Sequence, residues 1–179
     1  MHGIISLLDD KHYLLVENLW AELEQEFAVH GVYNTPYPHF SYQIAQSYNL
    51  EQLEPILQRF ALGQAAFKAK TSGLGIFNGP HPVLYIPVVR SAELTAFQQA
   101  LWPEISTAGS GISDYYHPAN WMPHITIGFG DTNKDNLSRI VQSLAERDFN
   151  WEITVNNVAL IYDTGTKQEL RSRFAFSKR

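Results

Sequence analysis

Two segments of the chain, residues 36–45 and 121–130, alternate polar and apolar residues in the manner of half-buried strands. Residues two apart on a strand share a face, so one face of each segment is predicted to point into the core. The predicted core-facing residues are Phe40, Tyr42 and Ile44 in the first segment and Ile125, Ile127 and Phe129 in the second. The other face of each strand is left for polar side chains.

Apolar residues recur at helical spacing in four further stretches, and each stretch is predicted to form a helix. The stretches are residues 10–30, 49–62, 91–103 and 133–147. Asn49 and Ser91 are suited to cap the second and third helices. Pro55 is expected to kink or shorten the second helix, and Pro103 to end or bend the third.

The remaining apolar runs predict additional strands, so that each half of the chain reads strand, helix, histidine strand, helix, strand. These strands cover residues 3–8, 67–72, 83–89, 151–155, 158–162 and 170–176, and residues 107–118 are predicted to form a loop. The repeated order predicts an α+β fold that is bilobal and duplicated, with two mainly antiparallel sheets facing a central cleft and helices packed outside. We expect a single bilobal domain, 1–179, with approximate halves 1–80 and 81–179.

Composition places the chain among ordinary globular proteins. It has 179 residues, of which 45% are apolar and 17% charged, and a formal net charge of −5. This acidity argues against a broad electrostatic clamp on a nucleic-acid backbone, although a small anion or one nucleic-acid end could still bind. Because the chain has no cysteine, disulfides, thiolate metal sites and a cysteine nucleophile are excluded.

Features of targeting and membrane insertion are missing from the sequence. The first apolar run, Ile4 to Leu8, is broken by Asp9-Asp10-Lys11 and lacks the basic start and long apolar centre of a signal peptide. No apolar stretch approaches a membrane-spanning length. We therefore expect a cytoplasmic protein with no membrane partner, and the sequence implies no obligate protein partner.

Each histidine strand contains a histidine two residues before a hydroxyl. The motifs are His39-Phe40-Ser41 and His124-Ile125-Thr126, both preceded by proline. Histidine has an ordinary pKa near ~6.5, so a pair can supply one neutral and one protonated ring for acid–base catalysis. Either motif alone is more typical of a solvated strand face. A metal site would need a third ligand, and no carboxylate-rich cluster stands near the motifs, so we predict none.

The pair of motifs resembles the signature of the 2H phosphoesterase superfamily, which contains 2′-5′ RNA ligase-like proteins and RNA 2′,3′-cyclic phosphodiesterases. The resemblance covers the organisation of nearly the whole chain, but residue identity only at the two motifs. It implies metal-independent, cofactor-free opening of 2′,3′-cyclic phosphates, with reversible 2′-5′ RNA ligation as a second activity. His39 and His124 would be the acid and base, while Ser41 and Thr126 would bind phosphate and could orient the rings.

The implied partner is a nucleotide or an RNA terminus that carries a cyclic phosphate. Four aromatic residues near the motifs are candidates for stacking a base, although covering the core is the more common role of such rings: Tyr37, Tyr115, Tyr116 and Trp121. Candidate cations for the phosphate are Arg90, Lys68, Lys70, Arg171 and Arg173. Two other functions stay open at this point: a phosphoesterase for a non-RNA cyclic phosphate such as ADP-ribose cyclic phosphate, and a non-catalytic module that binds nucleotides or RNA ends.

Overall fold

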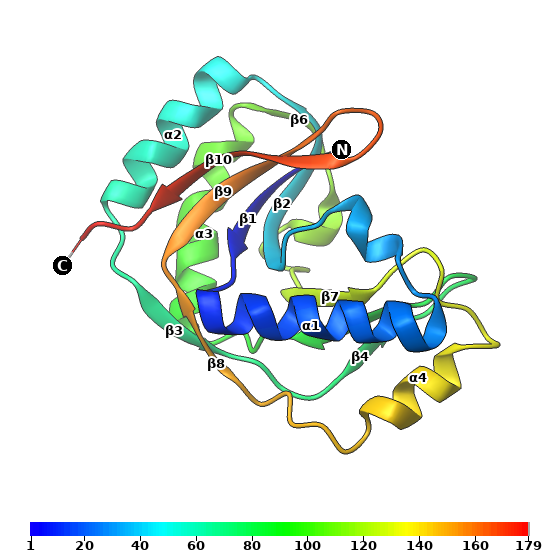
Figure 1. Cartoon of the computed structure of the whole chain (residues 1–179). Helices are drawn as coiled ribbons and strands as arrows, with labels where there is room; N and C mark the ends of the chain where they lie inside the picture. The colour runs from blue at the N-terminus through cyan, green and yellow to red at the C-terminus, as the bar shows by residue number, and fades with distance from the viewer. Residues whose placement is uncertain (179) are drawn as a thin grey trace.

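The computed structural model describes residues 1–178 and contains four α-helices, two short 3-10 helices and ten strands among them (Figure 1). The helices are α1 (Asp10–Phe27), α2 (Leu50–Leu62), α3 (Ala92–Ser106) and α4 (Leu137–Leu144), and the 3-10 helices are η1 (Gly31–Asn34) and η2 (Asp114–Tyr116). The strands are β1 (His2–Leu7), β2 (His39–Tyr48), β3 (Phe67–Lys70), β4 (Gly75–Phe77), β5 (Val83–Pro87), β6 (Gly109–Ile112), β7 (His124–Gly128), β8 (Glu152–Val155), β9 (Asn157–Asp163) and β10 (Gln168–Ala175).

The strands form one large and two small antiparallel sheets, which confirms the predicted α+β class. The large sheet has the order β10-β9-β1-β2-β6 and carries the first histidine motif on β2. A three-stranded sheet, β4-β5-β7, carries the second motif on β7. The third sheet is the β3-β8 ribbon, and a single bridge between Thr71 and Val88 joins its end to the end of β5. The two motifs therefore lie on different sheets.

The two expected halves of the chain, which meet at residue 80, do not form separate sheets. The large sheet takes β1 and β2 from the first expected half of the chain and β6, β9 and β10 from the second. The small sheets likewise pair β3 and β4 with strands that follow residue 80. The predicted loop 107–118 also contains β6, whose four residues include two glycines and carry no hydrophobic alternation.

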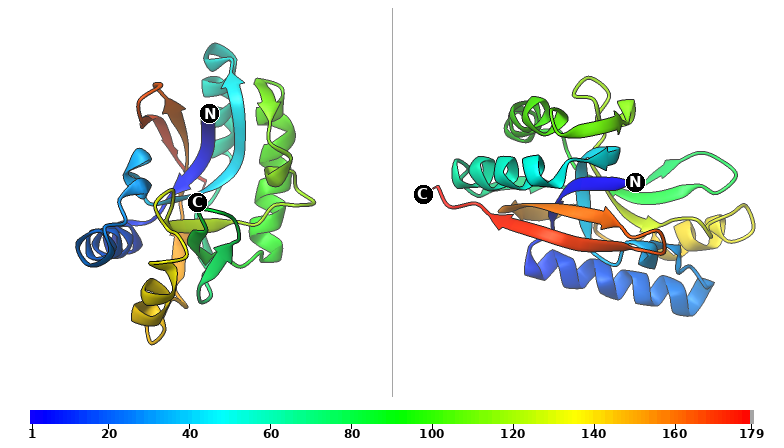
Figure 2. Two further views of the ribbon diagram at one scale, coloured as in Figure 1. Left: turned by 90° about the vertical axis from the view of Figure 1, so that its right-hand side faces the viewer. Right: turned by 90° about the horizontal axis from the view of Figure 1, so that it is seen from above.

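Helices α2 and α3 cover one face of the large sheet. Figure 2 shows them side by side on that face, where they contact each other and the strands, whereas α1 contacts β7 of the three-stranded sheet. The predicted capping residues are confirmed, because Asn49 accepts a hydrogen bond from the backbone N–H of Gln52 and Ser91 accepts one from Leu94. Both helices run through their prolines, Pro55 and Pro103, without ending there.

One apolar core connects the sheets and helices. It includes the buried faces of α1, α2 and α3 together with residues of both histidine strands. A smaller cluster of Ile5, Leu7, Ala159 and Ile161 lies on the large sheet, with Tyr37 packed against it. The histidine strands are thus anchored by their buried residues, which leaves their polar residues at the junction of the sheets.

Candidate active site

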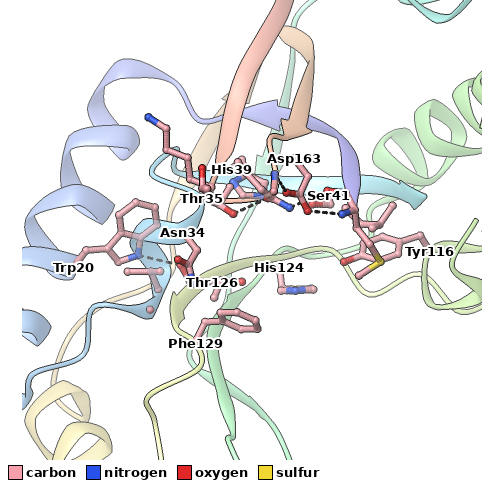
Figure 3. Close-up of a pocket in the computed structure, with 18 residues that line it drawn as sticks. Trp20, Asn34, Thr35, His39, Ser41, Tyr116, His124, Thr126, Phe129 and Asp163 are labelled. Carbon is pink, nitrogen blue, oxygen red and sulfur yellow. Dashed lines mark hydrogen bonds and ion pairs between the residues drawn. The ribbon is translucent and has the colours of Figure 1, made fainter. Parts of the chain in front are cut away.

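Four residues that the sequence singles out line one cavity of about 500 Å³: His39, Ser41, His124 and Thr126. Figure 3 shows the β2 pair, His39 and Ser41, on one side of this cavity and the β7 pair, His124 and Thr126, on the other. Other lining residues come from α1, η1 and its following loop, and the β9–β10 hairpin, among them Trp20, Val32, Asn34, Thr35, Thr166, Lys167 and Gln168. The fold therefore brings residues of two sheets to one opening.

The two imidazoles are held in the same way. His39 Nδ1 lies 2.5 Å from the carbonyl oxygen of Tyr37, and His124 Nδ1 lies 2.7 Å from that of Met122. A carbonyl oxygen only accepts hydrogen bonds, so each Nδ1 must be the donor. In both rings the lone pair then resides on Nε2, and Nε2 is the nitrogen available for proton transfer.

The hydroxyls of Ser41 and Thr126 make no hydrogen bond to another protein group within residues 1–178, although the backbone carbonyls of both residues do. We expected that these hydroxyls could orient the imidazole rings. In the structure, backbone carbonyl oxygens orient the rings instead. Both hydroxyls remain able to donate to an anion in the cavity.

A β-bulge interrupts each histidine strand at the same distance from its histidine. On β2 the pairing with β1 shifts by one residue at Tyr42, and on β7 the pairing with β5 shifts at Ile127. Each of these extra residues is the third after its histidine. Bulges of this kind re-aim the side chains that follow them, and they are common beside active sites.

The bulges overturn part of the predicted alternation. Ile44 and Phe129, each the fifth residue after its histidine, line the cavity, and Phe129 is 48% exposed. The prediction that both point into the core is wrong, because one extra residue moves the following side chains to the opposite face. Gln43 is buried instead, where it donates to the Ser106 hydroxyl and accepts from the Tyr48 hydroxyl.

The surroundings of both histidines favour the neutral ring. Burial lowers the pKa of His39 to about 4, and the neighbouring His124 contributes in the same direction, while the Tyr37 carbonyl opposes the shift. Burial also lowers the pKa of His124, against the opposing effect of the Met122 carbonyl. The ring of His124 lies against two aromatic rings, with centroids 4.9 Å from Phe77 and 5.1 Å from Tyr85. Without a ligand, both imidazoles are neutral at pH 7.

The four aromatic residues predicted near the motifs have different environments. Tyr116 lines the cavity. Tyr115 is 84% exposed and lies outside the cavity lining, while Tyr37 is half-buried and packs against the smaller core cluster. Trp121 is fully buried, 5.7 Å from the ring of Tyr42, so it cannot stack on a base in this structure.

Several residues that line the cavity could not be recognised in the sequence. Ile44 and Phe129 have the spacing of core residues, and Lys167 lies in a hairpin that shows no motif. Of the lysines and arginines in residues 1–178, only Lys167 lines the cavity, and its Nζ lies 3.0 Å from a carboxylate oxygen of Glu169. Arg90 was a candidate for the phosphate, but its guanidinium donates to the backbone carbonyls of Pro118 and Trp121.

Two further findings concern the described residues as a whole. Within residues 1–178, no three side chains of His, Cys, Asp or Glu lie together in a group that could hold a metal ion. None of the helices in this part of the chain has both the length and the apolar character to cross a membrane.

The fold and the paired motifs define an α+β protein of the two-histidine phosphoesterase class. The sequence model of the 2′-5′ RNA ligase superfamily matches residues 13–167. The chain therefore belongs to the 2′-5′ RNA ligase superfamily, the 2H phosphoesterases, as the resemblance of its motifs predicted. A search of curated proteins found no relative by sequence.

Solved structures show the same fold at low sequence identity. The crystal structure of TT0787 of Thermus thermophilus has a TM-score of 0.66 and 16% identity, over 98% of this chain and 97% of that chain. E. coli LigT complexed with 3′-AMP has a TM-score of 0.60 and 16% identity, over 99% of this chain and 98% of that chain. At this identity the similarity shows the fold alone.

Proposed function

We propose that the protein is a cyclic phosphodiesterase that opens 2′,3′-cyclic phosphates of RNA ends or nucleotides by acid–base catalysis between His39 and His124, with reversible 2′-5′ RNA ligation as a second activity. The observation that carries the proposal is the matched geometry of the motifs. Each imidazole donates its Nδ1 hydrogen to a backbone carbonyl two residues before it, so both Nε2 atoms are left for chemistry in the cavity that Ser41 and Thr126 also line. Membership of the superfamily and the LigT complex with 3′-AMP agree with a nucleotide ligand.

The reaction needs one imidazole in each protonation state. The neutral ring accepts a proton from water at Nε2 while the water oxygen forms a bond to phosphorus. The bond from phosphorus to one ribose oxygen breaks, and the protonated ring gives its Nε2 proton to that oxygen. Ser41 and Thr126 donate to the phosphate oxygens, whose negative charge grows in the transition state. No metal or cofactor takes part in this proposal, and we do not assign acid and base individually.

Binding of the anionic substrate can itself favour protonation of one imidazole. Burial lowers the pKa of both imidazoles in the ligand-free protein. A phosphate anion beside an imidazole favours the charged form of the ring and raises its pKa. Binding would therefore bring a proton to the site together with the phosphate.

Two residues of the cavity wall are proposed to contact the base. Tyr116 lines the cavity on the η2 side, and Phe129 presents a half-exposed ring at the end of β7 (Figure 3). Aromatic faces stack nucleobases with little dependence on sequence. Of these two, Phe129 offers the larger exposed surface and is therefore the stronger candidate.

The proposal is tested with purified protein in EDTA and a panel of substrates. The panel contains nucleoside 2′,3′-cyclic phosphates, ADP-ribose cyclic phosphate and short RNAs that end in a cyclic phosphate. Turnover of a nucleoside or RNA substrate is expected, and the position of the phosphate in the product identifies the leaving oxygen. Binding without turnover would instead favour a nucleotide-binding module, and turnover of the ADP-ribose substrate alone would move the substrate outside RNA.

His39→Ala and His124→Ala are each expected to reduce turnover by about 100- to 10,000-fold, because each removes one partner of the acid–base pair. His81→Ala is the matched control, since His81 is exposed and does not line the cavity. Circular dichroism should show both variants folded. Near wild-type turnover by either one on a verified substrate would contradict the assignment.

A further inference from the structure

Two buried tryptophans connect the histidine motifs to other parts of the fold. The indole N–H of Trp121 donates to the backbone carbonyl of Ser41 at 2.8 Å, and the indole N–H of Trp20 donates to the carbonyl of Thr126 at 3.1 Å. Trp121 is 0% exposed and Trp20 is 4% exposed. In each motif, the carbonyl that receives an indole N–H belongs to the residue that carries the hydroxyl.

The arrangement is crossed. Trp121 lies three residues before His124, on the segment that leads into the second motif, yet it bonds to the first motif. Trp20 lies on α1, which directly follows β1, the neighbour of the first motif's strand, yet it bonds to the second motif. Each motif is therefore held by a residue that reaches it from the side of the other motif.

Both contacts fall where strand pairing is interrupted. Ser41 and Thr126 each stand directly before the extra residue of a bulge, at the point where the regular hydrogen-bond ladder of the strand is disturbed. The indoles supply donors to the backbone at these points. Trp121 is itself fixed by Arg90, which donates to its carbonyl at 2.9 Å and lies 5.9 Å from the centre of its ring.

We propose that Trp20 and Trp121 are positioning residues that orient the hydroxyls of Thr126 and Ser41, respectively, toward the phosphate. Within residues 1–178 these hydroxyls have no hydrogen bond of their own, so the backbone to which they are attached sets their positions. An indole bonded to the carbonyl of the same residue limits rotation of that backbone. Small displacements of positioned groups reduce catalytic rates strongly. The inference rests on the proposed function, because it assigns the hydroxyls to the phosphate.

The test uses tryptophan-to-phenylalanine substitutions, which keep an aromatic ring but remove the indole N–H. Trp121→Phe and Trp20→Phe are each combined with Ser41→Ala and with Thr126→Ala. Turnover of a nucleoside 2′,3′-cyclic phosphate and, separately, the affinity for 3′-AMP are measured for every variant. Trp151→Phe is the matched control, because its indole N–H also donates to a backbone carbonyl, that of Asp148, away from the cavity.

The expected result is a crossed pattern of coupling. Each single Trp→Phe variant should lose about 3- to 10-fold in kcat/KM, the range of one neutral hydrogen bond. The loss from Trp121→Phe should disappear in the Ser41→Ala background and persist in the Thr126→Ala background. Trp20→Phe should show the reverse pattern. Trp151→Phe should couple with neither hydroxyl.

Other outcomes separate this inference from the proposed function. Equal losses in both backgrounds, in parallel with a lowered melting temperature, would mean that the indoles only stabilise the fold and would overturn the positioning role. If 3′-AMP binds with the crossed pattern but no cyclic phosphate is turned over, the positioning role stands and the enzymatic proposal fails. If the wild-type protein neither binds nor turns over any of these nucleotides, both fail.

Discussion

Single residues set the protonation chemistry of this cavity. His39 and His124 have the same hydrogen-bond arrangement, yet their surroundings differ, since His124 lies against the Phe77 and Tyr85 rings. Burial is the main cause of the lowered pKa of both rings, and the neighbouring His124 lowers the pKa of His39 further. The pH dependence of catalysis is where these shifts become measurable.

We expect a bell-shaped dependence of kcat/KM on pH, centred on the acidic side of 6.5. The productive ligand-free form has one neutral and one protonated imidazole. The pKa of His39 is about 4 and that of His124 is lowered below 6.5, so this form is populated only between these two lowered pKa values. As pH rises through the higher of the two pKa values the protonated ring is lost, and kcat/KM should fall about tenfold per unit.

Steady-state kinetics from pH 4 to 9 on one cyclic nucleotide would measure this profile. The falling limb of kcat should lie at higher pH than that of kcat/KM, because bound phosphate raises the imidazole pKa. A plateau of kcat/KM that extends from neutral pH to pH 9 would contradict the lowered pKa values.

Phe129→Ala is expected to raise KM for nucleoside 2′,3′-cyclic phosphates by about 5- to 150-fold, the range of one lost base stack of 1–3 kcal/mol. Phe129→Tyr should keep most of the affinity because it keeps the aromatic face. Ribose 2′,3′-cyclic phosphate, which has no base, is the matched substrate, and its KM should not change. A similar loss for both substrates would show that Phe129 acts on the phosphate site or on the fold.

At the scale of elements, the sequence predicted most helices and strands because their apolar spacing is regular. The helix of Val16, Leu19 and Leu23 and the strands around both histidines are examples. The bulges could not be predicted, since they depend on how β1 and β5 pair with the histidine strands. For the same reason Phe129 was assigned to the core, and Trp121, whose burial depends on distant contacts, was a candidate for stacking on the base.

The strand β4 supports the second histidine through a close contact that only glycine allows. A Cβ on Gly75 would lie 2.3 Å from Cζ of Tyr85, the ring that stacks on Phe77 and contacts His124. We expect Gly75→Ala to destabilise the protein by about 1–3 kcal/mol, as overpacking does, and to reduce turnover because it displaces Tyr85.

Gly79→Ala provides the comparison, because a Cβ at Gly79 would have no atom within 4 Å. Urea unfolding and turnover of both variants would measure the difference. Equal stability and activity of the two variants would show that the β4 contact is not needed for the site.

At the scale of the whole molecule, the cavity lies between residues of two sheets, and a bound nucleotide should hold them together. A nucleoside 2′- or 3′-monophosphate at 100 times its Kd should stabilise the protein by about 2.7 kcal/mol. For a chain of this length that corresponds to a rise of about 5–10 °C in Tm. Differential scanning calorimetry would measure it, with the free nucleoside as control. An equal rise with the nucleoside would mean that the phosphate is not recognised.

The overall class of fold could be predicted from the duplicated order of elements. That each sheet combines strands from both halves of the sequence could not. Sequence order suggested that each half forms its own sheet, whereas pairing of β1 with β9 joins the two ends of the chain. Local hydrophobic patterns predict the element itself but do not specify its partner strand. Only contacts between residues far apart in sequence decide that choice.

The pairing of β1 with β9 affects how the protein is made. A nascent chain already contains both histidines when residue 124 leaves the ribosome, but the inner strand β1 then still lacks its neighbour β9 (Asn157–Asp163). Until β9 and β10 are synthesised, β1 has an unpaired edge, which is open to pairing with other chains. The wall that holds His39 is therefore completed only after β9 and β10 have been synthesised, well after both histidines.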